Sequence, residues 1–163
     1  MIKKKVLIVG VPGVGKSTLC KTILERLSGV LHLTASDYVK EKGEVDNDQQ
    51  SLVRLIKSVA DKFKGKLILI DGHLTFDNFL IPLETLKLLE LDSIIVLKEE
   101  PNTILNRRKL DLKRARKNES VEKIRSSQEK ELSYSELVSE RLCVPVYTLK
   151  SPTVEKVLLL LEK

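Results

Sequence analysis

Residues 10–17 read G-V-P-G-V-G-K-S, which matches the phosphate-binding loop pattern G-x-x-x-x-G-K-[ST] at every fixed position. A short apolar segment rich in β-branched residues precedes the loop, and a segment with Leu19, Ile23 and Leu27 at helical spacing follows it. A strand, a glycine loop and a helix in this order bring backbone N–H groups and the positive end of a helix against phosphate oxygens. The segment therefore predicts a nucleotide-binding P-loop.

Each residue type in this loop has an expected task. The glycines let the backbone turn tightly and approach the phosphates closely. Lys16 is placed to reach the β- and γ-phosphates, and the Ser17 hydroxyl is placed to ligate Mg²⁺. The residues expected to bind ATP are Gly10, Gly13, Val14, Gly15, Lys16, Ser17 and Thr18.

The chain has 163 residues, of which 42% are apolar, and we expect one compact domain over residues 1–163. No apolar run approaches the ~20 residues of a membrane span, and the basic start leads directly into the first core strand, so we expect a cytoplasmic protein. The net charge of +6 suits a protein that handles polyanions, either nucleotide phosphates or RNA. Cys20 and Cys143 form no C-x-x-C pair and have no flanking histidine at metal-binding spacing, which predicts reduced, packed thiols.

Apolar segments alternate with helical patterns along the chain, as they do in a parallel α/β sheet. Several of these segments are almost continuously apolar, which is typical of strands that are buried on both faces. Helical spacing is clear over residues 52–63 and 154–161. We therefore predict an α/β P-loop fold, a five-stranded parallel sheet flanked by helices, with strands at residues 5–9, 30–33, 66–70, 93–97 and 144–149.

In such sheets the ligand lies beyond the carboxyl ends of the strands. This rule selects Ser36 and Asp37 after the second predicted strand, and Asp71 and His73 after the third. A P-loop enzyme needs a carboxylate at a strand end to hold Mg²⁺ directly or through water, and Asp71 is the candidate. His73 is either a further site residue or a solvated loop histidine, and both interpretations stay open on spacing alone.

A dense basic run covers residues 107–117, where seven of the eleven residues are Lys or Arg. Three interpretations are open: a solvated helix face, an RNA-binding patch, or a lid whose arginines cover the transferring phosphates. On an unbroken helix Arg107 and Arg114 share a face, whereas Arg116 points elsewhere. If Arg116 also reaches the phosphates, the helix has to break or bend around residues 112–118.

Three motifs together resemble a known family: the P-loop with Thr18, I-D-G-H-L at 70–74, and I-I-V-L-K-E-E-P-N-T-I-L-N-R-R-K-L-D-L-K-R-A-R at 94–116. They resemble the archaeal-type adenylate kinases and equally their compact relatives, the adenylate kinase/ATPases linked to maturation of the small ribosomal subunit. The resemblance implies a nucleoside monophosphate kinase fold, with a short monophosphate-binding arm at about residues 34–64 and a lid at about 107–119. It also implies the reaction Mg·ATP + AMP ⇌ 2 ADP.

The same resemblance assigns roles to individual residues. The expected catalytic residues are Lys16, Asp71, Arg107, Arg114 and Arg116. The residues expected on the acceptor side are Ser36, Asp37, Lys40 and His73, and the residues expected to organise Mg²⁺ are Ser17 and Asp71.

Three positions on the acceptor side depart from the family pattern. Lys40 and Asn47 stand where related enzymes tend to have arginine, and Thr75 stands where bacterial-type adenylate kinases carry an AMP-binding arginine. Two alternatives to an adenylate kinase therefore stay open. One is an ATPase that acts as an assembly factor on an RNA–protein particle, with RNA or a ribosomal protein as its partner, and the other is a kinase for a different small acceptor.

Overall fold

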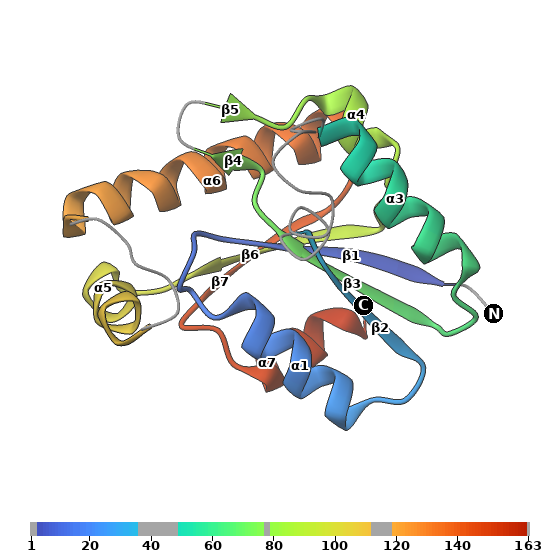
Figure 1. Cartoon of the computed structure of the whole chain (residues 1–163), viewed down its shortest axis with the longest axis horizontal. Helices are drawn as coiled ribbons and strands as arrows, with labels where there is room; N and C mark the ends of the chain where they lie inside the picture. The colour runs from blue at the N-terminus through green and yellow to red at the C-terminus, as the bar shows by residue number, and fades with distance from the viewer. Residues whose placement is uncertain (1–2, 36–48, 77–78, 112–118, 163) are drawn as a thin grey trace.

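The structure is a computed structural model that describes residues 3–35, 49–76, 79–111 and 119–162. Its centre is a sheet of five parallel strands in the order β2-β3-β1-β6-β7 (Figure 1). The strands are β1 (Lys4–Val9), β2 (Val30–Thr34), β3 (Leu67–Gly72), β6 (Ser93–Lys98) and β7 (Val146–Lys150). The five predicted strands and their parallel arrangement are confirmed.

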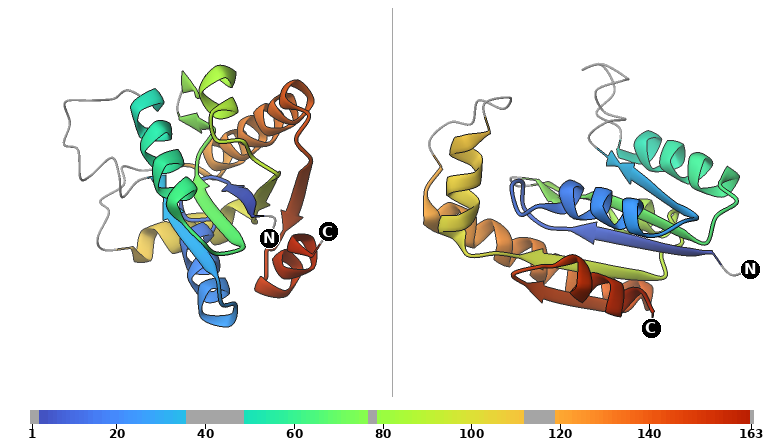
Figure 2. Two further views of the ribbon diagram at one scale, coloured as in Figure 1. Left: turned by 90° about the vertical axis from the view of Figure 1, so that its right-hand side faces the viewer. Right: turned by 90° about the horizontal axis from the view of Figure 1, so that it is seen from below.

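Helices cover both faces of this sheet, as Figures 1 and 2 show. One face carries α1 (Lys16–Arg26) and α7 (Val154–Leu161), and the other carries α3 (Gln49–Lys62), α4 (Leu83–Lys87) and α6 (Val121–Leu142). Helix α5 (Pro101–Leu110) follows β6 and stands beyond the carboxyl ends of the strands. A small antiparallel pair, β4 (Thr75–Phe76) and β5 (Phe79–Leu80), is separate from the main sheet.

The alternation of side chains along β1 supplies two separate cores. Val6 and Ile8 belong to the core under α1 and α7, whereas Leu7 and Val9 belong to the core under α3, α4 and α6. Each such buried aliphatic side chain contributes about 1.5–3 kcal/mol, so the central strand is held firmly from both sides. Because Val9 is the register partner of Gly72, the loops that follow β1 and β3 begin next to each other.

Several boundaries differ from the predictions. β3 continues through Gly72, so Asp71 is part of the strand and does not follow it. The sequence did not predict β4, β5 and α4, because elements of two to five residues are too short to carry a periodic pattern. Cys20 is packed as expected, but this expectation is wrong for Cys143, which is exposed. Across the part of the chain that the structure describes, none of the helices combines the length and the apolar composition needed to cross a membrane.

Candidate active site

The P-loop joins the end of β1 to the start of α1, and its glycines have direct steric causes. Gly10 has a φ of +153°, and a Cβ at this position would lie 2.7 Å from the backbone oxygen of Leu97 on the neighbouring strand β6. Gly15 caps α1 with a φ of +106°, a left-handed conformation that glycine adopts without strain. Glycine at position 10 therefore lets the loop lie close to the sheet, and glycine at position 15 lets the chain turn into α1 without strain.

The Lys16 side chain is buried within this loop. Its ammonium donates to the carbonyl oxygens of Gly10 at 2.6 Å and Val11 at 3.4 Å. Burial lowers the pKa of Lys16 to about 8, although the negative charges of Asp71 and Glu131 act in the opposite direction. Since charges interact more strongly in a buried site of low dielectric constant, an anion that enters the loop is attracted to this ammonium and favours its protonated form.

Asp71 lies near the end of β3 and is only 3% exposed. Its Oδ2 accepts hydrogen bonds from His32 Nε2 at 2.6 Å and from Thr34 Oγ1 at 3.3 Å, and the carboxylate is also hydrogen-bonded to the Ser17 side chain. Burial alone would raise the pKa of Asp71, but the hydrogen bond and charge of His32, together with Ser17 and Lys16, lower it overall. The structure thus brings Ser17 and Asp71 together around an ionised carboxylate.

His32 is a site residue that the sequence analysis did not select. It lies on β2, where Thr34 is the register partner of Asp71. Since side chains alternate along a strand, His32 lies two residues earlier on the same face as Thr34. The contact between His32 and Asp71 depends on β2 lying beside β3. Once this strand order is known, the register of the two strands predicts the contact.

The connection from β3 to β4 is fixed by Glu131 of α6. Glu131 is 1% exposed, and its carboxylate accepts from Leu74 N–H at 2.7 Å, Thr75 N–H at 3.0 Å and the Thr75 hydroxyl at 2.6 Å. Burial raises the pKa of Glu131, and the hydrogen bonds from Leu74 and Thr75 offset this effect in part. Thr75 therefore anchors this loop through both its N–H and its hydroxyl.

His73 lies on this same connection and lines a cavity of about 660 Å³. The cavity opens between α3 and the β4–β5 pair, and most of its wall is apolar, including Leu52, Val53, Phe76 and Phe79. His73 therefore lies at the wall of a largely apolar cavity on the α3 side of the sheet.

Two neighbouring arginines of α5 contact the P-loop in different ways. Arg107 donates from Nη1 to the carbonyl oxygen of Val14 at 3.1 Å, and its side chain is 47% exposed. Arg108 is buried, and its Nε and Nη2 donate to the carbonyl oxygen of Pro12 at 2.7 and 2.5 Å. Arg108 also forms an ion pair with Glu119. Arg107 was predicted as a site residue from the sequence, whereas Arg108 was not, because its contact with Pro12 depends on how α5 packs against the loop.

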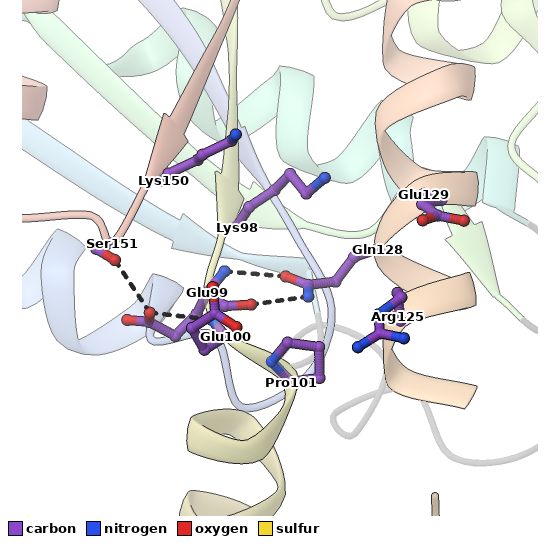
Figure 3. A pocket seen from close by; sticks show the side chains of 9 residues that line it. All are labelled: Lys98, Glu99, Glu100, Pro101, Arg125, Gln128, Glu129, Lys150 and Ser151. Carbon is purple, nitrogen blue, oxygen red and sulfur yellow. Dashed lines mark hydrogen bonds between the residues drawn. The ribbon is translucent and has the colours of Figure 1, made fainter. Parts of the chain in front are cut away.

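A polar cluster lies where β6 leads into α5, and Figure 3 shows the hydrogen bonds among Glu99, Gln128 and Ser151. Gln128 of α6 bonds both backbone groups of Glu99, accepting from its N–H at 3.0 Å and donating to its carbonyl oxygen at 2.8 Å. The Glu99 carboxylate accepts from the Ser151 hydroxyl at 3.2 Å and lies 3.5 Å from Arg107 Nη2. Glu99, Gln128 and Ser151 line a second pocket, of about 270 Å³. Helix α6 thus fixes the corner that carries Arg107.

Several predicted site residues fall outside the described parts of the chain. They are Ser36, Asp37, Lys40, Arg114 and Arg116. The described part of α5 ends at Leu110, before the segment in which a break was expected.

Fold and site together define a class of protein. A P-loop between a parallel strand and a helix, with a carboxylate of the adjacent strand on the loop's serine, is the arrangement of P-loop nucleotide-binding enzymes. A family model described as an AAA domain matches residues 9–125. The adenylate kinase of Pyrococcus horikoshii is 31% identical over 145 residues, which cover 76% of this chain and 74% of that protein. The chain belongs to the adenylate kinase family.

One further relative resembles the chain in sequence, and one solved structure resembles it in fold. A Pyrococcus furiosus protein named "Putative adenylate kinase" is 36% identical over 106 residues, which cover 63% of this chain. The match covers 52% of that relative's length, so the chain spans about half of the relative. Among solved structures, the tunicamycin resistance protein of Deinococcus radiodurans is similar, with a TM-score of 0.59 over 92% of this chain and 99% of that one. At 14% identity this likeness concerns the fold alone.

Proposed function

We propose that this protein is an adenylate kinase, which transfers the γ-phosphoryl group of Mg·ATP to AMP and forms two ADP. The observation that carries the proposal is the contact between the Ser17 side chain and the ionised Asp71, directly beside the buried ammonium of Lys16. A phosphoryl-transfer site needs a loop for phosphates, a cation to neutralise them and a place for Mg²⁺. Membership of the adenylate kinase family supports the same reaction.

Mg²⁺ fits the donors of this site, because an ionised carboxylate and a hydroxyl are the hard oxygen ligands that it prefers. Ser17 and Asp71 would hold it, with Asp71 binding directly or through water. When bound, the ion would neutralise charge on the phosphate oxygens. His32 supports this role, since its hydrogen bond holds one Asp71 oxygen in place and favours the ionised form.

The remaining charges act on the transferring group. Lys16 would exchange the loop carbonyls for β- and γ-phosphate oxygens, and Arg107 would reach over the P-loop from α5. Arg114 and Arg116 complete a lid at about residues 107–119 in this proposal. An acceptor phosphate oxygen attacks in line, so no protein nucleophile is required, and the rate depends on alignment and exclusion of water.

The acceptor would occupy the cavity beside His73 and Thr75, with an arm at about residues 34–64 that contributes Ser36, Asp37 and Lys40. The largely apolar wall of this cavity favours one second candidate, a kinase whose small acceptor carries an apolar part. The proposal includes a single domain and a cytoplasmic location with nucleotides as partners.

The test is ADP formation from Mg·ATP alone and with AMP, CMP, GMP or UMP added. We expect strong stimulation by AMP with two ADP formed per AMP, and a dependence on Mg²⁺ that EDTA abolishes. Lys16→Ala should lose this activity, whereas Lys21→Ala, at an exposed position of α1, should retain it. Slow turnover that no monophosphate changes would contradict the proposal and favour an ATPase, whose salt-sensitive RNA binding can then be measured.

A further inference from the structure

Cys20, His32 and Asp71 come from three different elements and meet below the P-loop. Cys20 lies on α1, His32 on β2 and Asp71 on β3. Each residue offers one possible ligand atom, which is the sulfur of Cys20, a ring nitrogen of His32 and a carboxylate oxygen of Asp71. These three atoms lie within 4.8 Å of one another. Cys20 is 0% exposed, and the side chains of His32 and Asp71 are 8% and 4% exposed. The sequence spacing of these residues gives no sign of this cluster.

The donor set differs from the one that Mg²⁺ prefers. A thiolate, an imidazole and a carboxylate are the ligands of Zn²⁺ and of chemically similar cations such as Co²⁺, whereas Mg²⁺ takes oxygen ligands. Zinc sites with three protein ligands keep a fourth position for a water or another oxygen ligand. The Thr34 hydroxyl, 3.2 Å from His32 Nε2 and 3.3 Å from Asp71 Oδ2, lies at the edge of the same cluster.

We propose that Cys20, His32 and Asp71 form a binding site for a thiophilic divalent cation of the zinc class. Asp71 would then belong to two sites, because the same carboxylate contacts Ser17 in the proposed Mg²⁺ site. Occupation by zinc withdraws this carboxylate from Mg²⁺ and inhibits phosphoryl transfer. The inhibition rests on the proposed adenylate kinase activity, whereas cation binding itself does not.

The binding step balances without any change of oxidation state. The cation replaces the hydrogen bond between His32 Nε2 and Asp71 Oδ2 with one bond to each atom. The Nε2 proton of His32 moves to Nδ1 when the ring is neutral and is lost to solvent when the ring is an imidazolium, and either change frees the Nε2 lone pair for the cation. The Cys20 thiol loses its proton to solvent as the sulfur–metal bond forms, so one proton is released for each cation bound to a neutral His32 and two for an imidazolium.

The first experiment is a titration of the full chain with Co²⁺ in the absence of Mg²⁺, followed by absorption spectroscopy. We expect one equivalent of Co²⁺ to give a thiolate-to-cobalt charge-transfer band, and Zn²⁺ to displace it. Cys143→Ser is the matched control, since the other cysteine is exposed and outside the cluster. The band should persist in Cys143→Ser and disappear in Cys20→Ser and Cys20→Ala.

His32→Gln should weaken Co²⁺ binding about tenfold or more, since even the loss of an outer-shell partner has an effect of that size. Circular dichroism melts of each variant establish that the protein is folded. Absence of the band in the wild type, or its survival in a folded Cys20 variant, would overturn the proposal. Because absence of the band in the wild type already overturns the proposal, the proposal stays falsifiable even if a Cys20 variant fails to fold.

Activity separates the two proposals from each other. With Mg²⁺ in excess, low concentrations of Zn²⁺ should inhibit the wild type and Cys143→Ser but inhibit Cys20→Ser much less. Equal inhibition of Cys20→Ser would show that zinc acts elsewhere and would overturn the inhibitory role. A charge-transfer band in a protein that lacks AMP-dependent turnover would leave the cation site standing and contradict only the proposed function.

Discussion

Replacement of Glu131 tests whether α6 holds the connection that follows Asp71. Glu131 is 1% exposed and accepts hydrogen bonds from Leu74 N–H, Thr75 N–H and the Thr75 hydroxyl. In Glu131→Ala two backbone donors lose their acceptor, and each buried unpaired group costs about 1–3 kcal/mol. The free energy of unfolding should therefore fall by about 4 kcal/mol. For a domain of this size, the corresponding fall in Tm is about 8–16 °C.

Urea denaturation followed by circular dichroism measures this loss, and calorimetry measures the shift in Tm. Thr75→Val is the matched variant, because it removes only the hydroxyl donor and should cost about 1 kcal/mol. In the double variant the two losses should fall short of additivity by about 1 kcal/mol, since the Thr75 hydroxyl has no carboxylate left to contact. A loss below about 1 kcal/mol in Glu131→Ala would refute the reasoning, because water would then satisfy these donors.

Three further predictions concern the same site. Burial raises the pKa of Glu131, so its protonated form contributes stability that is complete below the ordinary value of 4.5 and is lost as the pH rises through the folded-state value. The Tm of the wild type relative to that of Glu131→Gln should accordingly be higher at pH 4.5 than at neutral pH. A difference that does not change with pH would contradict this linkage. Arg108→Lys keeps the charge but loses the forked contact with Pro12, so initial-rate measurements should give a KM for ATP about tenfold higher, whereas an unchanged KM would show that the loop holds its shape alone. Gly10→Ala places a Cβ 2.7 Å from the Leu97 oxygen and should remove the stabilisation that ATP gives in a thermal-shift assay; an undiminished shift would count against the steric argument.

The elements that were predictable from the sequence are those whose burial alone dictates their pattern. β1, β3 and β6 lie at the centre of the sheet, and their apolar runs identify them without knowledge of their neighbours. The amphipathic helix α3 is marked in the same way by one buried face. The pair β4 and β5 has two residues in each strand, and a pattern of period two cannot be recognised over that length.

The residues of the candidate site also differ in how far they could be predicted from the sequence. The P-loop is contiguous in sequence, so its geometry follows from local rules, and Asp71 was found because a carboxylate at the end of an apolar run is itself a local signal. His32 and Cys20 are near Asp71 only because β2 lies beside β3 and α1 packs across both strands. Strand order is a property of the whole fold, so contacts that depend on it are not predictable from local patterns in a single sequence.

Helix α6 connects the two loops that carry different parts of the proposed reaction. Gln128 and Glu131 are three residues apart and lie on one face of the helix. Gln128 holds the backbone of Glu99, and with it the corner that carries Arg107, while Glu131 holds the loop after Asp71. Both side chains are buried, and burial of polar groups is unfavourable unless their hydrogen bonds are made. Apolar residues would fill this face of the helix without that penalty, but they would leave both loops unanchored. The two polar residues therefore position the loops more than they add packing, and α6 sets the spacing between the helix that carries Arg107 and the loop that carries Thr75.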